Sequence, residues 1–203
     1  KGFASVDASL VLEDQALNLN GSIELQNSSL SYNMSTQEKI LEPINSNINP
    51  KKKRKKAKTG ETGFKPSINF NINLALMIGH KVQIDVNPFL RSLIAPSTPI
   101  YVAADTASGV WSIKGDIVLR GGEISYLNRN FYLKQGRLIL NETQDHFDPN
   151  ITVRAETRER DSNGDNVNII LSAISQNLSK FNAVLSSIPA RSESEIMSLL
   201  GQI

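Results

Sequence analysis

Residues 68–78 read Ile-Asn-Phe-Asn-Ile-Asn-Leu-Ala-Leu-Met-Ile, with an apolar side chain at every second position from Ile68 to Ile78. Successive side chains of a β-strand point to opposite faces, so this period predicts a strand with one apolar and one polar face. Eleven residues at about 3.3 Å each would reach roughly 36 Å, which is longer than most strands. The stretch therefore predicts a deep or elongated sheet.

The same alternation continues through Val82, Ile84 and Val86 until Pro88 ends it. It recurs in four other stretches, namely residues 17–25, 111–119, 151–155 and 167–171. Three glycine-containing segments lie between apolar runs and are predicted as tight hairpins, because such turns need positive φ: Arg120-Gly121-Gly122, Lys134-Gln135-Gly136 and Asn163-Gly164. The pattern predicts an all-β fold built as an antiparallel meander.

An internal repeat supports stacked strand pairs. Gly21-Ser-Ile-Glu-Leu25 followed by Leu30-Ser-Tyr32 matches Gly115-Asp-Ile-Val-Leu119 followed by Ile124-Ser-Tyr126 at the same spacing, with five of twelve positions identical. In repeat architectures each unit buries its apolar face against its neighbours.

Composition allows one folded domain, since 39% of the 203 residues are hydrophobic and 21% are charged. The absence of cysteine excludes disulfides, thiol nucleophiles and thiolate metal sites. The longest apolar run, Leu74–Ile78, is far shorter than the roughly 20 residues of a membrane-spanning helix. Lys1-Gly2-Phe3-Ala4 does not resemble a signal peptide, so we expect the chain to be a piece of a longer protein.

Basic charge is concentrated in one segment. Seven of the eight residues from Lys51 to Lys58 are Lys or Arg, and without them the net charge of +2 becomes −5. Residues 43–66, which contain this run and several Pro, Gly and Asn residues, are predicted as a long flexible loop. A solvated insertion is favoured over a nucleic-acid patch, because no aromatic residues are interleaved for base stacking. Contact with anionic lipid headgroups is an intermediate possibility.

No catalytic constellation can be assembled from the sequence. His146 lies beside Asp145 and Asp148 and could in principle bind a metal, although a polar loop is favoured. Asp161–Asp165 begins like a calcium loop, but its sixth position is Asn166 and its twelfth is Ser172, so a hairpin turn is favoured. We predict a protein without enzymatic activity, metal or cofactor.

The carboxyl end is the one segment with a helical pattern. Ser192 and Glu195 have the spacing of a capping box, and Gly201 is placed as a stop. Ile196, Leu199 and Leu200 share one face of this short helix. For the apolar faces of the predicted strands, the pattern favours neither of two interpretations: the core of a closed sandwich or barrel, or an open apolar surface.

Several short elements of the second half, taken in order, resemble the carboxy-terminal domain of TamB proteins: residues 115–126 (Gly-Asp-Ile-Val-Leu-Arg-Gly-Gly-Glu-Ile-Ser-Tyr), 128–131, 134–136, 147–149, 154–156 and 192–201. The resemblance runs from about residue 66 to the end. Residues 1–42 resemble the repeating strands that precede that domain, whereas the basic loop departs from the family pattern. The resemblance thus divides the chain into preceding strands (1–42), the basic loop (43–66) and a TamB-like domain (67–203).

The resemblance implies a U-shaped sheet, or β-taco, with an apolar trough, in the periplasmic part of an AsmA-like protein anchored in the inner membrane. It implies transport of phospholipid toward the outer membrane together with an outer-membrane barrel of the TamA or BamA type. Burial of an acyl chain gains about 0.8 kcal/mol per methylene without any catalytic group. The longest one-faced stripes nominate nine residues to line this trough: Phe70, Ile72, Leu74, Leu76, Val82, Ile84, Ile113, Ile117 and Leu119.

Two other functions stay open at this point. One is an assembly or secretion factor that offers strand edges to outer-membrane proteins, and the other is a nucleic-acid binder that uses the lysine run. For the terminal helix, contact of Ile196, Leu199 and Leu200 with the barrel is favoured over a cap on the chain's own trough.

Overall fold

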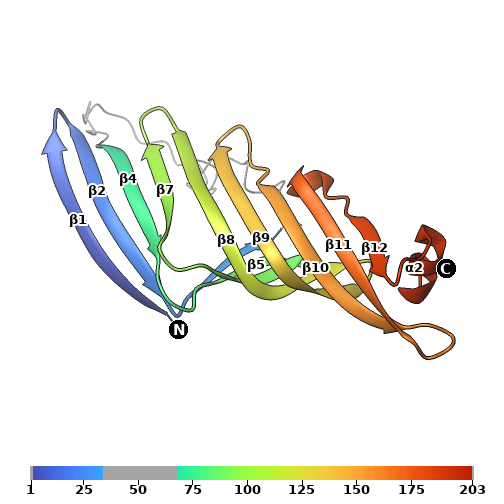
Figure 1. Ribbon diagram of the computed structural model, residues 1–203. Helices are drawn as coiled ribbons and strands as arrows, with labels where there is room; N and C mark the ends of the chain where they lie inside the picture. The colour runs from blue at the N-terminus through green and yellow to red at the C-terminus, as the bar shows by residue number, and fades with distance from the viewer. Residues whose placement is uncertain (1, 34–67, 203) are drawn as a thin grey trace, which may run out of the picture.

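The computed structural model describes residues 2–33 and 68–202, which form a single curved and unclosed sheet of twelve strands with one short helix at the carboxyl end (Figure 1). The predicted all-β, taco-like fold is confirmed. The strands are β1 (Phe3–Glu13), β2 (Ala16–Gln26), β3 (Ser29–Asn33), β4 (Asn69–Ile78), β5 (Gln83–Asn87), β6 (Leu90–Ile94), β7 (Thr98–Asp105), β8 (Val110–Tyr126), β9 (Arg129–Thr143), β10 (Asn150–Arg160), β11 (Asn166–Asn177) and β12 (Val184–Ile188). A 3₁₀ turn, η3 (Leu178–Lys180), and the helix α2 (Glu193–Leu199) complete the described elements.

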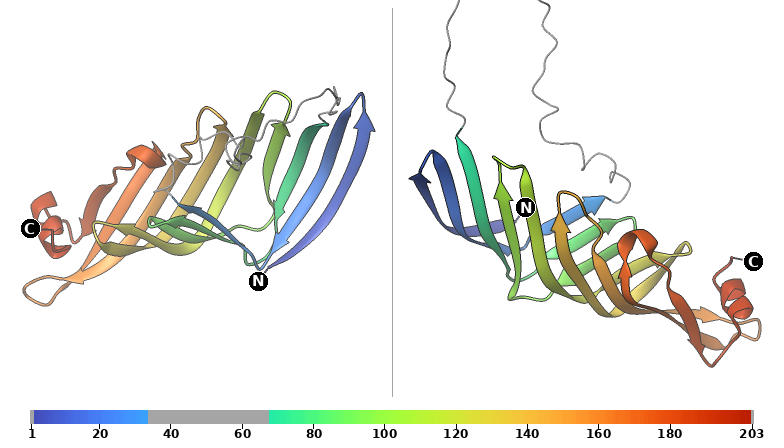
Figure 2. Two further views of the ribbon diagram at one scale, coloured as in Figure 1. Left: turned by 180° about the vertical axis from the view of Figure 1, so that it is seen from behind. Right: turned by 90° about the horizontal axis from the view of Figure 1, so that it is seen from above.

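The sheet forks at β8. Its main path runs β1-β2-β4-β7-β8-β9-β10-β11-β12, while β3, β5 and β6 form a branch that joins the same edge of β8 as β7 does. The beginning of β8 pairs with β7 and its end pairs with β6. We call β1, β2, β4, β7 and residues 110–119 of β8 the first wall, and β3, β5, β6 and residues 123–126 of β8 the second wall. Figure 2 shows the two walls from behind and from above.

The walls meet along a line of left-handed residues, which we call the fold line. Positive φ occurs there at Asn27 (48°), Lys81 (55°), Ser97 (65°) and the Gly121-Gly122 pair (65° and 103°). Backbone hydrogen bonds cross the line, such as the one from the Asn27 N–H to the His80 carbonyl at 2.9 Å and the one from the Ser97 N–H to the Ile78 carbonyl at 2.6 Å. The corner is therefore built without leaving these backbone groups unpaired.

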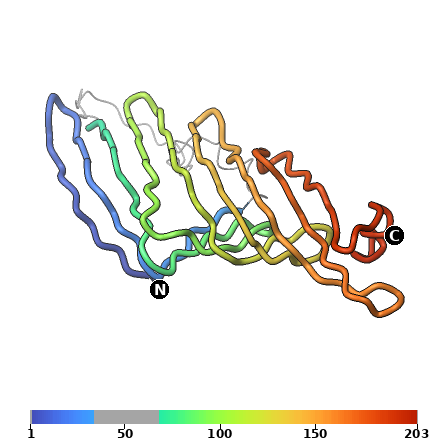
Figure 3. The backbone as a smooth tube through the Cα atoms, in the orientation of Figure 1, coloured from blue at the N-terminus to red at the C-terminus, as the bar shows by residue number. Residues whose placement is uncertain are grey.

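The internal repeat corresponds to this corner. Its first copy spans the end of β2, the fold line and β3, and its second copy spans the bend within β8. Each copy thus contributes one strand segment to the first wall and one to the second. The tube view follows both segments through the corner (Figure 3).

Two of the three predicted hairpins are wrong. Arg120-Gly121-Gly122 lies inside β8, where it makes the corner, and Lys134-Gln135-Gly136 lies inside β9 next to a register shift between β9 and β10. Asn163-Gly164 does form the turn between β10 and β11, with φ of 85° at Gly164. The positive φ of Gly121 and Gly122 serves a strand corner as well as a hairpin, so glycine alone did not separate the two. Gly136 does not have a positive φ, and a Cβ at this position would collide with the Leu119 side chain.

The predicted meander also needs correction, because two neighbouring pairs are parallel. β2 pairs with β4 and β3 pairs with β5 in parallel register. Parallel neighbours need a connection of about a dozen residues or more, which the 34–67 segment provides. Strands on both sides of that segment therefore belong to one sheet, while the basic run Lys51–Lys58 and most of the predicted loop 43–66 lie outside the described residues.

Candidate functional site: an apolar inner face that is open at one end

The register of the first wall places apolar side chains in continuous rows. Leu74 of β4 lies opposite Gly21 of β2 and Val102 of β7, and Val102 lies opposite Ile113 of β8. Residues directly opposite each other share a face of the sheet. Leu76 and Ile113 pack against the buried core cluster, so this face is the inner one.

A second row lies one step closer to the rim. Ile72 lies opposite Leu19 and Ala104, and Ala104 lies opposite Trp111. On the edge strand β1, Leu10 lies opposite Leu19 and carries the row outward. The nine predicted lining residues include none from β1 or β7, although the alternation Val6-Asp7-Ala8-Ser9-Leu10 was a usable signal for β1.

Exposure falls steeply along the inner side. Val6, Leu10 and Leu12 of β1 keep 60–65% of their surface exposed and Phe70 keeps 41%. The predicted lining residues Ile72, Leu74, Leu76 and Ile113 are half-buried. The other predicted lining residues are buried in the core beyond them: Val82, Ile84, Ile117 and Leu119. We call the part-exposed apolar surface of β1, β2, β4, β7 and the start of β8 the open inner face.

The opposite face of β2 and β4 carries a ladder of asparagine pairs. Asn71 Nδ2 donates to Asn18 Oδ1 at 2.9 Å, and Asn73 Nδ2 donates to Asn20 Oδ1 at 3.3 Å. These pairs join residues in parallel register between β2 and β4. A slip by one residue would place asparagines on the inner face, so the ladder and the apolar rows favour the same register.

Aromatic contacts of Phe147 join the two walls where the open inner face ends. Phe147 follows β9 in the sequence. Its ring centroid lies 5.0 Å from the ring centroid of Tyr32 in the second wall and 6.4 Å from that of Trp111 in the first wall. Farther on, the Phe181 ring lies 4.6 Å from Phe89 and 5.8 Å from Tyr126. Burial, followed by the charges of nearby Asp148 and Glu142, raises the pKa of Tyr32 above its ordinary value, so its hydroxyl is neutral at physiological pH.

Comparison with known families places this architecture. The family model of the TamB C-terminal domain matches residues 2–202. The chain belongs to the TamB family. The match extends much farther toward the amino terminus than the resemblance seen in sequence, which began near residue 66. A search of curated proteins finds no match.

Membership gives this TamB-family chain a role in biogenesis of the cell envelope and outer membrane, within a family whose proteins interact with outer-membrane proteins. In the described part of the chain, no helix has both the length and the apolar character needed to cross a membrane. The same part contains no cluster of three or more side chains suited to hold a metal ion. Asp161 organises the β10–β11 turn, because its Oδ1 accepts from the N–H groups of Asn163 and Asp165 at 3.0 Å each.

The terminal helix of this TamB domain docks on its own sheet. Ile196 and Leu200 are each 1% exposed, and Leu199 is half-buried. Arg129 Nε donates to the Leu200 carbonyl at 3.2 Å, and Gln202 Nε2 donates to the Leu127 carbonyl at 2.8 Å. The predicted capping box of Ser192 and Glu195 is confirmed.

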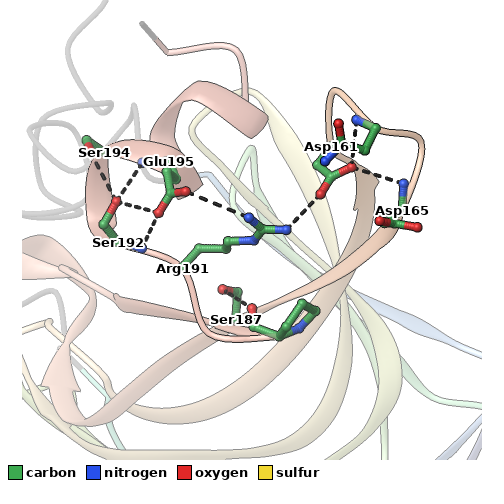
Figure 4. Close-up of polar contacts among 9 residues, drawn as sticks. Asp161, Asp165, Ser187, Arg191, Ser192, Ser194 and Glu195 are labelled. Carbon is green, nitrogen blue, oxygen red and sulfur yellow. Dashed lines mark hydrogen bonds and ion pairs between the residues drawn. The ribbon is translucent and has the colours of Figure 1, made fainter.

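Arg191 fastens the helix to the β10–β11 hairpin. Its guanidinium lies 2.7 Å from Asp161 and 3.8 Å from Glu195 (Figure 4). In this conformation Ile196 and Leu200 are inaccessible to a partner. Contact of Ile196, Leu199 and Leu200 with a barrel stays a prediction that requires the helix to leave its site.

Proposed function

We propose that the open inner face holds the acyl chains of phospholipid. The chain would serve as the periplasmic part of an inner-membrane-anchored protein that carries lipid toward the outer membrane and acts with a barrel of the TamA or BamA type. The observation that supports this proposal is the pair of apolar rows that stay part-exposed beside a sealed core. Such rows centre on Ile72 and Leu74 and run across four strands.

The energetics favour a lipid ligand. Each methylene removed from water gains about 0.8 kcal/mol, and the side chains of the rows lose contact with water at the same time. The rows present no charged side chain next to Leu74, because its register partners are Gly21 and Val102. Transport of this kind breaks no covalent bond, so we propose that the protein works without enzymatic activity, and no nucleic acid is needed.

A charge on the open inner face tests the proposal. Leu74→Arg places a guanidinium among the rows, where loss of its hydration costs several kcal/mol unless it reaches water. Asn73→Arg is the matched control, because it adds the same charge one residue away on the polar outer face. We expect at least tenfold less phospholipid in purified Leu74→Arg than in Asn73→Arg, measured by extraction and mass spectrometry. Equal lipid content in two folded variants would reject the lipid assignment at Leu74.

A second candidate is an assembly factor for outer-membrane proteins. Among the described strands β1 pairs only with β2, so one edge of its eleven residues is unpaired within residues 2–33 and 68–202. An unpaired strand edge is a template for strand addition. Capture of a barrel-strand peptide by lipid-free protein, with loss of capture after Val11→Pro, would favour this second function.

A further inference from the structure

We propose that Phe147, together with Tyr32 and Trp111, forms an aromatic stop that ends the path of an acyl chain along the inner side of the sheet. This inference rests on the proposed function. The acyl chain would lie on the open inner face from β1 to the start of β8, with its methyl end against the stop. The half of the domain beyond the stop would serve as a closed core and carry no lipid.

The position of Phe147 supports a block between the walls. Tyr32 stands on β3, where its register partner is the buried Val86 of β5. Trp111 stands on β8 opposite Ala104, at the end of the outer row of the open inner face. Since the Phe147 ring contacts both Tyr32 and Trp111, it spans the space that an acyl chain would have to cross.

Beyond the stop, the inner side chains of β8, β9 and β10 are buried in the core cluster. Ile117, Leu138 and Ile151 lie opposite one another on β8, β9 and β10 and are at most 2% exposed. The Phe89 and Phe181 rings contact each other and pack against this core. Insertion of a chain here would require separation of well-packed side chains, which costs more than the open path does.

A buried acid holds the stop in place. Glu142 is 2% exposed, and its Oε2 accepts from the Asp148 N–H at 2.6 Å, directly after Phe147 in the chain. The Asp148 carboxylate accepts from the Ser179 N–H at 2.9 Å and from the Ser179 hydroxyl at 2.6 Å. These bonds fix the β9–β10 connection to η3, and Glu142 is accordingly a positioning residue for Phe147.

The length of the open inner face is consistent with a single acyl chain. From β1 to β8 the path crosses four strand spacings of about 4.8 Å each, or roughly 19 Å. This length is comparable with one extended acyl chain of a common membrane phospholipid. A chain that entered at the β1 edge would therefore reach Trp111 with its methyl end.

Trp111 is the one tryptophan of the 203-residue chain, so its fluorescence reports on the stop directly. The experiment loads the protein with phosphatidylcholines brominated either near the methyl end or near the headgroup of the acyl chain, because bromine quenches indole at short range. In the unmodified protein we expect at least threefold stronger quenching by the methyl-end bromines.

Removal of the stop should change this pattern. In Phe147→Ala or Tyr32→Ala the chain can slide past Trp111, so the strongest quenching should move to bromines nearer the headgroup. Phe3→Ala is the matched control, because it removes an equal side chain that is 72% exposed and lies opposite Gln26 on the outer face. It should keep the original pattern.

The outcomes separate the stop from the lipid function. Bound lipid with equal quenching from both positions in the unmodified protein would overturn the stop and leave the lipid function standing. An unchanged pattern in both folded stop variants would overturn it as well. Failure of the protein to bind the brominated lipids at all would overturn the proposed function and the stop together.

Discussion

Gly122 shows how a single residue shapes the two-walled sheet. Its φ is 103°, and a Cβ at this position would collide with the carbonyl oxygen of Arg91 on β6. Gly121 also has positive φ, at 65°, but a Cβ at this position would have no other atom within 4 Å. The close approach of β6 to β8 at the corner therefore depends on Gly122, whereas Gly121 provides only the backbone conformation.

Alanine substitutions should separate these two requirements. Gly122→Ala combines backbone strain with a collision against Arg91 and should lower the free energy of unfolding by roughly 3 kcal/mol. Gly121→Ala has only the left-handed conformation to accommodate and should cost about 1 kcal/mol. Urea denaturation followed by circular dichroism measures both values. Equal losses would show that β6 does not approach β8 as closely as the structure describes.

At this scale the sequence was partly informative. The Gly121-Gly122 pair correctly indicated positive φ. Because a strand corner and a hairpin use the same backbone conformation, a hairpin was predicted where β8 has a corner. Lys81 and Ser97 continue the fold line with residue types that give no sign of positive φ, whereas Asn27 is of a type that tolerates it. Leu127 and Asn128 make the β8–β9 turn with φ of 50° and 58°, which an Asn-Gly rule does not detect.

Among the elements, α2 is the clearest case of a segment that needs tertiary contacts. A helix of seven residues is unstable alone in water, and its stability comes from the side chains that it buries. Ile196 and Leu200 supply that burial, while the Arg191–Asp161 pair joins the helix to the β10–β11 turn. The helix thus caps the sheet at the end opposite β1, as Figure 1 shows.

Substitution of Leu200, the residue that directly follows α2, should measure how much the docked helix contributes to stability. Leu200→Ala removes a fully buried side chain and should lower the free energy of unfolding by about 2–5 kcal/mol. Ser198→Ala changes an exposed position of the same helix and should alter stability by no more than about 0.5 kcal/mol. Thermal unfolding of the two variants gives the comparison. A Leu200→Ala variant as stable as Ser198→Ala would mean that the helix is not docked in solution.

The local sequence pattern predicted most of the individual strands and the helix correctly. It predicted poorly which of these elements pack or pair with one another. The strands at 68–78, 82–86 and 167–171 and the capping box at Ser192 follow from periodicity and are present. The docking site of α2 was not predictable in this way, because Arg129 and Leu200 are separated by 71 positions in the chain. Parallel pairing of β2 with β4 was missed for the same reason, since pairing direction is not encoded in the alternation itself.

At the scale of the whole molecule, one sheet serves two purposes. Strands β8–β11 and the second wall close into a core around Ile117, Leu138 and Ile151, while β1, β2, β4 and β7 leave an apolar face part-exposed. Alternation in the sequence could nominate Leu74 and Ile117 for the same stripe, but could not show that one is open and the other sealed. The border between the two parts lies at Phe147, whose ring contacts Tyr32 of the second wall and Trp111 of the first.

The most direct test of lipid binding by the open inner face is native mass spectrometry of this domain after gentle purification from a bacterial host. The expected spectrum contains the bare protein and a second species heavier by the mass of one phospholipid, which tandem dissociation releases and identifies. The second species should be depleted in Leu74→Arg and retained in Asn73→Arg. A spectrum of bare protein alone, unchanged after incubation with phospholipid vesicles, would contradict the central claim.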